Sequence, residues 1–95
     1  MLDGRRIRHF SPVTLFATPN PATGETILHL GSMEKGNARI ELFNMQGRLV
    51  AADSIAITND SESIPLSLHT LPGGIYRLVV VTVNGIYTTP LTVAR

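Results

Sequence analysis

The sequence predicts an all-β fold, an immunoglobulin-like antiparallel sandwich of about seven strands. Three observations support this prediction. Apolar and polar side chains alternate with period two in several short runs, turn signals recur every eight to twelve residues, and no segment has the i, i+3, i+4, i+7 spacing of an amphipathic helix. In a chain of 95 residues, this combination is typical of two packed sheets with a single core.

The composition excludes several classes of protein. The chain is 43% hydrophobic and 16% charged with a net charge of +1, which provides no basic face for nucleic acid. No apolar run approaches the roughly 20 residues of a membrane-spanning helix. The chain has no cysteine, so packing and backbone pairing must hold the fold together without disulfides.

The first residues differ from the rest of the chain. Arg5, Arg6 and Arg8 make them basic, whereas the remainder is close to neutral. The stretch that follows is interrupted by polar residues and Pro12, which makes it a poor hydrophobic region for a signal peptide. We therefore expect residues 1–12 to be a leader or linker remnant and residues 13–95 to be the sandwich domain.

The first two strands are expected on either side of a proline turn. Residues 13–17 form a short apolar run, which ends at Pro19-Asn20-Pro21 because two prolines fix φ and donate no ladder hydrogen bond. A second strand follows over residues 25–30. A polar loop bracketed by glycines, residues 31–37, ends it.

The middle of the chain predicts a hairpin and a further strand. Apolar and charged side chains alternate over residues 38–42, as in a half-buried strand. A turn over residues 44–48, with Gly47 at a positive φ, returns the chain into residues 49–52. After a stretch of mixed character, residues 64–68 alternate again, and Pro65 confines that strand to a sheet edge or a bulge.

The stretch from Leu71 to Arg95 predicts a corner, an apolar strand and a final hairpin. Residues 78–81 are apolar at every position, so we expect one face of that strand to be covered by the second sheet and the other by a loop or partner. Asn84-Gly85 predicts a two-residue type I′ turn with positive φ at both residues. Residues 86–93 then form the last strand, at an edge.

No catalytic or metal-binding pattern emerges from the sequence. His9, His29 and His69 lie far apart and form no metal-ligating pair, and we expect His29 and His69 to be ordinary strand-end or surface residues. No nucleophile-elbow motif marks a serine. The glycines precede no helix, so they form no phosphate cradle. We expect neither enzymatic activity nor a cofactor.

Four motifs carry a resemblance to a known family. In order they are Pro19-Asn20-Pro21-Ala22, the strand-turn-strand of residues 38–50 with Gly47-Arg48 in its turn, Leu71-Pro72-Gly73-Gly74-Ile75-Tyr76, and the short final hairpin. Together they resemble the C-terminal sorting domain of type IX secretion (Por secretion) cargo in Bacteroidetes, over residues 13–95. The chain departs from the family in having Thr18 where an aromatic residue is frequent, and in lacking lysine in the last strand.

The resemblance implies a seven-stranded sandwich that sorts a larger secreted protein. It implies three partners: cargo domains that precede the sandwich in the same precursor, an outer-membrane translocon that recognises it, and a sortase-like protease that removes it. Cleavage is expected upstream of Pro19. The route would cross the periplasm and end at the cell surface or in the medium, with the cargo attached to lipopolysaccharide or released.

The resemblance also assigns residues to roles. The family-motif turns fall on Pro19, Asn20, Pro21, Gly47, Arg48, Leu71, Pro72, Gly73, Gly74 and Tyr76. We expect the translocon to recognise the last strand by strand addition, because an edge strand exposes unpaired N–H and C=O groups. The residues of that recognition strand are Ile86, Tyr87, Thr88, Thr89, Pro90, Leu91, Thr92, Val93, Ala94 and Arg95. The same free edge would permit an edge-strand dimer.

Two other interpretations compete with the sorting domain. Residues 71–78 resemble the Leu-x-Pro-Gly-x-x-Tyr corner of fibronectin-III-like accessory modules, one residue shorter and without the tryptophan of that family. A carbohydrate-binding module would need exposed aromatic side chains, and Tyr87 is the best candidate, because Tyr76 is expected to be a corner residue bonded to backbone. The third interpretation is a structural spacer without a recognition role.

Overall fold

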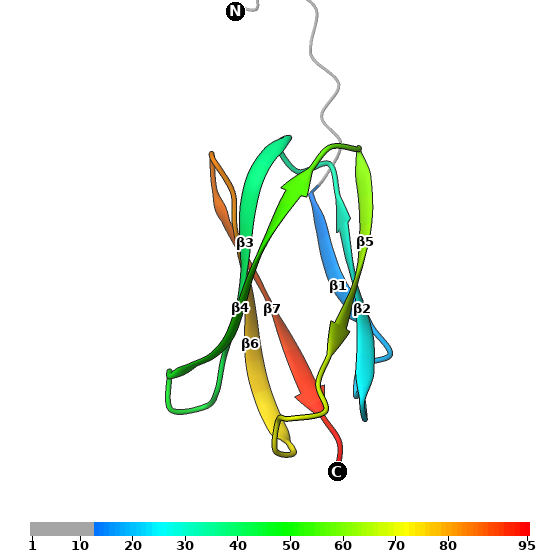
Figure 1. Ribbon diagram of the computed structural model, residues 1–95, viewed down its shortest axis with the longest axis vertical. Coiled ribbons are helices and arrows are strands. Elements are labelled where there is room, and N and C mark those ends of the chain that lie inside the picture. Colours follow the sequence, from blue (N-terminus) through cyan, green and yellow to red (C-terminus); the bar gives the residue numbers. More distant parts are fainter. Residues whose placement is uncertain (1–12) are drawn as a thin grey trace, which may run out of the picture.

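The computed structural model describes residues 13–95, and they form two antiparallel sheets packed face to face (Figure 1). The predicted leader, residues 1–12, lies outside the described part. The predicted all-β sandwich of seven strands is confirmed. The strands are β1 (Thr14–Thr18), β2 (Glu25–Gly31), β3 (Gly36–Phe43), β4 (Leu49–Ile57), β5 (Ser61–Ser67), β6 (Gly74–Val81) and β7 (Ile86–Val93).

The two sheets have the orders β1-β2-β5 and β4-β3-β6-β7. Strands β1, β5, β4 and β7 are therefore sheet edges. Pro65 lies in the edge strand β5 opposite Ile27 of β2. The bond from the Leu68 N–H to the Gly24 carbonyl (2.8 Å) places the ladder bonds on the even-numbered residues of this strand. The nitrogen of Pro65 therefore faces the free edge, and no ladder bond is lost. The edge positions predicted for residues 64–68 and for residues 86–93 are both confirmed.

The core lies between the sheets and follows from the alternation in the sequence. In each strand every second side chain points inward, because successive residues of a strand face opposite sides of the sheet. Burial of these apolar side chains is the main stabilising contribution in a domain without disulfides. The largest fully buried side chains are Leu28, Ile57, Leu68, Leu78, Val80, Leu91, Val93 and Thr26.

The second half of β6 is covered by the second sheet on its inner face, as predicted, but the predicted loop or partner over its outer face is not found among residues 13–95. Leu78 and Val80 point into the core and are fully buried. Val79 points to the outer face, yet only 8% of its surface is exposed. It lies there between Glu41 of β3 and Thr88 of β7.

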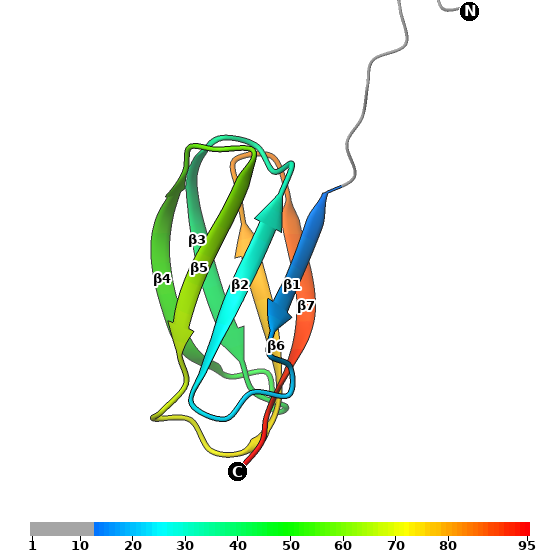
Figure 2. The same cartoon turned by 90° about the vertical axis from the view of Figure 1, so that its right-hand side faces the viewer.

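The first strand connects the two sheets. β1 pairs with β2 in the smaller sheet, and it runs beside β7 of the larger sheet in the same direction (Figure 2). Beyond β1 the chain crosses over, and Ala22 forms a parallel bridge with Val93 at the end of β7. The segment that contains Pro19-Asn20-Pro21 is therefore the crossing point between the sheets.

The turn between β3 and β4 has the predicted geometry. Gly47 has a φ of 80°, a left-handed conformation that glycine adopts without steric cost. Its N–H donates to the Asn44 carbonyl (2.9 Å). The Asn44 side-chain oxygen accepts from the N–H groups of Gln46 and Arg48 (3.0 and 2.9 Å), which fixes the loop from inside.

The predicted type I′ turn at Asn84-Gly85 is wrong. Neither residue has a positive φ, and four residues rather than two separate β6 from β7. Thr82 explains the difference. Its hydroxyl accepts from the N–H groups of Asn84 and Gly85 (3.4 and 3.1 Å), so a side chain satisfies the turn and the backbone keeps ordinary dihedral angles.

Asn84 and Gly85 have other roles in this turn. The Asn84 side chain donates to the Glu34 carboxylate (2.8 Å) and so links the loops at one end of the sandwich. A Cβ at residue 85 would lie 3.0 Å from the Tyr87 hydroxyl oxygen. The glycine is therefore needed for the close approach of Tyr87.

Candidate recognition edge and groove

The predicted recognition strand is β7 with the two residues that follow it. Among the seven strands of residues 13–95, β7 pairs only with β6, and the pairing is continuous from Gly74↔Val93 to Val81↔Ile86. The opposite side of β7 is consequently a sheet edge. It faces away from the four-stranded sheet and runs alongside β1 of the other sheet (Figure 2).

Side chains divide β7 into an inner and an outer set. Tyr87, Leu91 and Val93 point inward, and the last two are fully buried. Ile86, with 67% of its surface exposed, points outward together with the other even-numbered residues. The ten predicted recognition residues thus include core residues, whose burial stabilises the sandwich, as well as exposed ones.

The outward backbone groups of β7 also differ along its length, because those of its second half are hydrogen-bonded. The Asn20 side chain donates from Nδ2 to the Pro90 carbonyl (3.1 Å) and accepts at Oδ1 from the Thr92 N–H (2.9 Å). Ala22 continues this pairing: its N–H donates to the Thr92 carbonyl (2.9 Å), and its carbonyl accepts from the Ala94 N–H (2.7 Å). Residues 20–22, which we call the edge clamp, therefore close the edge of β7 from Pro90 to Ala94.

The edge clamp is itself held in place by the core. Ala22 is fully buried, and the buried Thr26 hydroxyl donates to the Pro19 carbonyl (2.8 Å). The peptide bonds that precede Pro19 and Pro21 are both cis. The sequence assigns Pro19-Asn20-Pro21 to a turn, but it gives no local signal for contacts with β7, because the partners of Asn20 lie about 70 residues away.

The other half of β7 remains open. The outward hydrogen bonds of Pro90, Thr92 and Ala94 show that the even-numbered residues direct their backbone groups away from β6. By the same alternation Ile86 and Thr88 direct theirs outward. No strand within residues 13–95 pairs with them on that side. We call residues Ile86–Thr89 the open half of β7.

The Leu71–Tyr76 motif forms a corner that holds the end of the sequence. The Tyr76 hydroxyl donates to the Pro72 carbonyl (2.6 Å), as expected for a tyrosine bonded to the backbone upstream of its strand. The Arg95 guanidinium donates to the carbonyls of Leu71 (3.1 Å) and Leu68. Arg95 is therefore tied to the corner.

A glycine makes room for this contact. A Cβ at residue 73 would lie 3.0 Å from the Arg95 Cβ, closer than carbon atoms ordinarily approach. The next residue, Gly74, has a φ of 158°, which carries the chain into β6. The two glycines of the motif thus have different roles, one in contact with Arg95 and one in backbone geometry.

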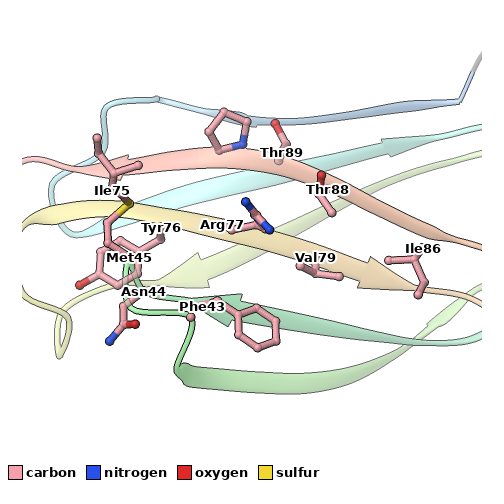
Figure 3. Close-up of a pocket in the computed structure, with 12 residues that line it drawn as sticks. Phe43, Asn44, Met45, Ile75, Tyr76, Arg77, Val79, Ile86, Thr88 and Thr89 are labelled. Atoms are coloured by element: carbon pink, nitrogen blue, oxygen red, sulfur yellow. The ribbon is translucent and has the colours of Figure 1, made fainter.

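A groove with a volume of about 680 Å³ lies on the outer face of the four-stranded sheet (Figure 3). It runs along β6 between the β3–β4 turn and β7. Met45 and Ile75 lie at one end, Ile86 lies at the other, and Arg77 lies between them (Figure 3). The turn residue Gly47 and the open half of β7 both contribute to its lining.

The charged turns of the domain lie outside this groove. Lys35 and Asp60 form an exposed ion pair (2.8 Å), which lowers the pKa of Asp60 and raises that of Lys35 through their hydrogen bond. The Glu62 carboxylate accepts from the N–H groups of Thr58 and Asn59 (2.9 and 3.0 Å). These hydrogen bonds lower the pKa of Glu62.

The remaining sequence candidates have structural roles or no defined one. His29 stacks on Phe16 with ring centroids 4.6 Å apart and shares a hydrogen bond with Thr18 Oγ1 (2.8 Å). His9 lies outside the described residues. In residues 13–95 no three His, Asp or Glu side chains gather as a metal site would require, and no helix there could span a membrane.

Tyr87, the candidate for glycan stacking, is half-buried and packs against the core. A ring in this position offers less of its face to a sugar than an exposed aromatic platform would. Tyr87 and Tyr76 are the aromatic residues of the last hairpin, and Tyr76 is buried in the corner.

Comparison with known proteins identifies the family and agrees with the fold. A family model described as the secretion system C-terminal sorting domain matches residues 17–94. The fold resembles a crystal structure of dimeric latent PorU from Porphyromonas gingivalis, with a TM-score of 0.65 and 19% sequence identity. The similarity covers 93% of this chain and 10% of that one, so this chain spans about a tenth of its length. A search of curated proteins gives no match.

The family model covers the edge clamp, the Gly47-Arg48 turn, the corner and β7, and it extends over most of the chain. The four motifs that carried the resemblance thus lie in one matched region. This chain belongs to the secretion system C-terminal sorting domain family.

Proposed function

We propose that this domain is the sorting signal of a larger cargo protein and directs that cargo through the type IX outer-membrane translocon, for attachment to the cell surface or release. The observation that carries the proposal is the match to the sorting-domain family over residues 17–94. The domain itself would have no catalytic role. Its partners would be the preceding cargo domains, the translocon and a sortase-like protease.

Strand addition at β7 is the proposed mode of recognition. Backbone pairing needs free N–H and C=O groups, and the open half of β7 offers them at Ile86 and Thr88. The edge clamp occupies the corresponding groups from Pro90 to Ala94. We therefore narrow the proposed recognition surface from Ile86–Arg95 to the open half, with the later residues supporting the fold.

The position of the open half suits a signal that is connected to cargo. β1 and β7 run in the same direction, so the start of β1 and the open half lie at the same end of the sandwich (Figure 2). Cargo would join the domain at that end. A translocon component bound to the open half would then be close to the junction at which a sortase-like protease would cut, upstream of Pro19.

The test of the proposal uses a reporter fused ahead of this chain in a bacterium with a type IX system. We expect the reporter to reach the cell surface with the chain attached, and to stay in the periplasm when the chain is omitted. Removal of Ile86–Arg95 should have the same effect as omission. Surface display that persists after this removal contradicts the proposal.

A further inference from the structure

We propose that the groove on the outer face of the four-stranded sheet binds an extended segment of a partner protein, with alternating apolar side chains and one carboxylate that pairs with Arg77. This proposal deepens the proposed function and rests on it for the role of the partner, a component of the secretion machinery. The chemistry of the segment follows from the groove alone.

Exposed apolar side chains lie at both ends of the groove. Met45 and Ile75 at one end are 71% and 52% exposed, and Ile86 at the other end is also largely exposed. Phe43 lies between them on the same face and is partly exposed, whereas Val79 is nearly buried. A bound segment with apolar side chains would cover the exposed ones.

Arg77 places one positive charge in the middle of this apolar surface. The residues directly opposite Arg77 on β3 and β7 are Phe43 and Pro90. Glu41, two residues along β3 from Phe43, lies opposite Val79 and pairs with Arg39. No carboxylate within residues 13–95 forms an ion pair with Arg77. A guanidinium in apolar surroundings favours a planar carboxylate that can accept two of its N–H groups.

Arg39, on the same face of the sheet, provides a comparison, because a carboxylate of the chain neutralises its charge. Its Nε lies 2.9 Å from a carboxylate oxygen of Glu41, two residues along the same strand. Among residues 13–95, one outward arginine of this face therefore has an ion-pair partner and the other has none. This contrast indicates that the missing carboxylate comes from the bound segment.

An extended backbone suits the site because the open half of β7 forms one wall of the groove, through Ile86 and Thr88. An extended segment that lies along β6 in the groove presents every second side chain to the outer face of the sheet. That face bears both the groove and Arg77. Such a segment would therefore alternate apolar residues toward the groove, with its acidic residue among them.

A second copy of this chain, paired through β7, would not supply a carboxylate to Arg77. Two copies that pair through β7 would bring Ile86, Thr88, Pro90 and Thr92 to each other's outer face, and none of these is acidic. Each Arg77 would remain without a carboxylate. Charge complementarity therefore favours a different protein over self-association.

The test titrates the full chain, labelled for amide NMR, with two soluble peptides of alternating valine and threonine that differ only in a central glutamate or glutamine. We expect the glutamate peptide to bind about fivefold more tightly, as an ion pair of about 1 kcal/mol would give. The shifted amides should include those of Val79, Ile86 and Thr88.

Two arginine variants identify the charge responsible. Arg77→Gln should abolish the preference for the glutamate peptide, and Arg77→Lys should retain part of it because the charge remains. Arg39→Gln is the matched control on the same face and should leave the preference intact. Equal affinity of the wild-type chain for both peptides, or a preference that survives Arg77→Gln, would overturn the proposal.

The remaining outcomes separate this proposal from the sorting function. Concentration-dependent shifts of the groove amides without peptide would identify a second copy as the occupant and contradict the proposal. If the peptides fail to discriminate while removal of Ile86–Arg95 still blocks export, the sorting function stands and the groove proposal fails. If discrimination depends on Arg77 while export survives that removal, the groove is a binding site and the sorting mechanism fails.

Discussion

Asn20 shows how one side chain can replace part of a strand. Its amide presents a donor and an acceptor with the spacing of a backbone pair, and these bind the Pro90 carbonyl and the Thr92 N–H. The prolines on either side cannot donate to a ladder, so the side chain makes the pairing that the backbone there cannot. The Pro-Asn-Pro motif is therefore a turn that also closes an edge.

We expect Asn20→Ala to lower the free energy of unfolding by about 1–2 kcal/mol, because two hydrogen bonds to β7 are lost. The measurement is urea denaturation, together with amide hydrogen exchange at Thr92, which should become faster. Asn37→Ala, which changes an exposed asparagine on β3, should alter the stability by less than about 0.5 kcal/mol. Unchanged stability and unchanged protection of Thr92 in Asn20→Ala would contradict the role of the clamp.

The two tyrosines of the last hairpin form a matched pair for a second prediction. Tyr76→Phe removes the donor to the Pro72 carbonyl and should cost about 1 kcal/mol of stability. Tyr87→Phe should cost less than about 0.5 kcal/mol. Chemical denaturation measures both. Equal effects of the two substitutions would show that the Tyr76 hydrogen bond does not stabilise the corner.

Residues with only local partners were the easiest to predict from the sequence. Gly47 has its positive φ because the turn between two adjacent strands requires it. Asn84-Gly85 has the same kind of local signal, but the type I′ turn that it predicts does not form. The nearby Thr82 hydroxyl accepts the N–H groups of both residues instead. Propensity for a turn type is thus overruled by a single side chain within three residues.

At the scale of elements, β7 combines two roles along one strand. Its buried side chains and its clamped half belong to the sandwich. Its open half has an exposed isoleucine and outward backbone groups that pair with no strand of residues 13–95. Alternation in the sequence predicts the inner and outer faces of this strand. The division along its length depends on the edge clamp, which joins β7 only in the folded chain.

A pair of alanine substitutions in β7 separates stability from recognition. Leu91→Ala should lower the free energy of unfolding by about 2–5 kcal/mol, because Leu91 is fully buried and a cavity results. Ile86→Ala should change it by less than about 0.5 kcal/mol. Denaturation of the purified domain measures both effects. A large loss of stability in Ile86→Ala would mean that the open half belongs to the core.

The turn between β4 and β5 makes stability depend on pH. The N–H groups of Thr58 and Asn59 lower the pKa of Glu62 in the folded chain, so its contribution is complete above the unfolded pKa of about 4 and is lost as the pH falls through the lower folded pKa. In Glu62→Gln the melting temperature should decrease less on acidification. Asp60, whose pKa is also lowered, is present in both proteins, so identical pH profiles would contradict the role of Glu62.

At the scale of the whole molecule, the sequence predicts the fold well because the sandwich depends mainly on alternation and turn signals. It predicts the recognition site only in outline. The Arg39–Glu41 pair follows from a local pattern, since residues two apart in a strand share a face. Strand order, which is not local, decides that Arg77 lies between Phe43 and Pro90. The groove forms because the sheet order places β6 beside β7 and because the β3–β4 turn lies next to them.

In the proposed sorting signal the core and the corner keep β7 in place, and the edge clamp closes its second half. The open half, which pairs with no strand of residues 13–95, lies at the end where cargo would join. We propose that its backbone groups are recognised during export. A change that blocks those groups and spares the core tests this recognition more directly than removal of the strand does.

The measurement is surface display of the fused reporter with Thr88→Pro compared with Thr88→Val. Proline removes the outward N–H and places a ring at the edge, where proline is tolerated by a sheet, while valine keeps the N–H and favours the strand. We predict that Thr88→Pro leaves the domain folded and the reporter in the periplasm, and that Thr88→Val is displayed normally. Normal display of a folded Thr88→Pro fusion would contradict recognition through the open half of β7.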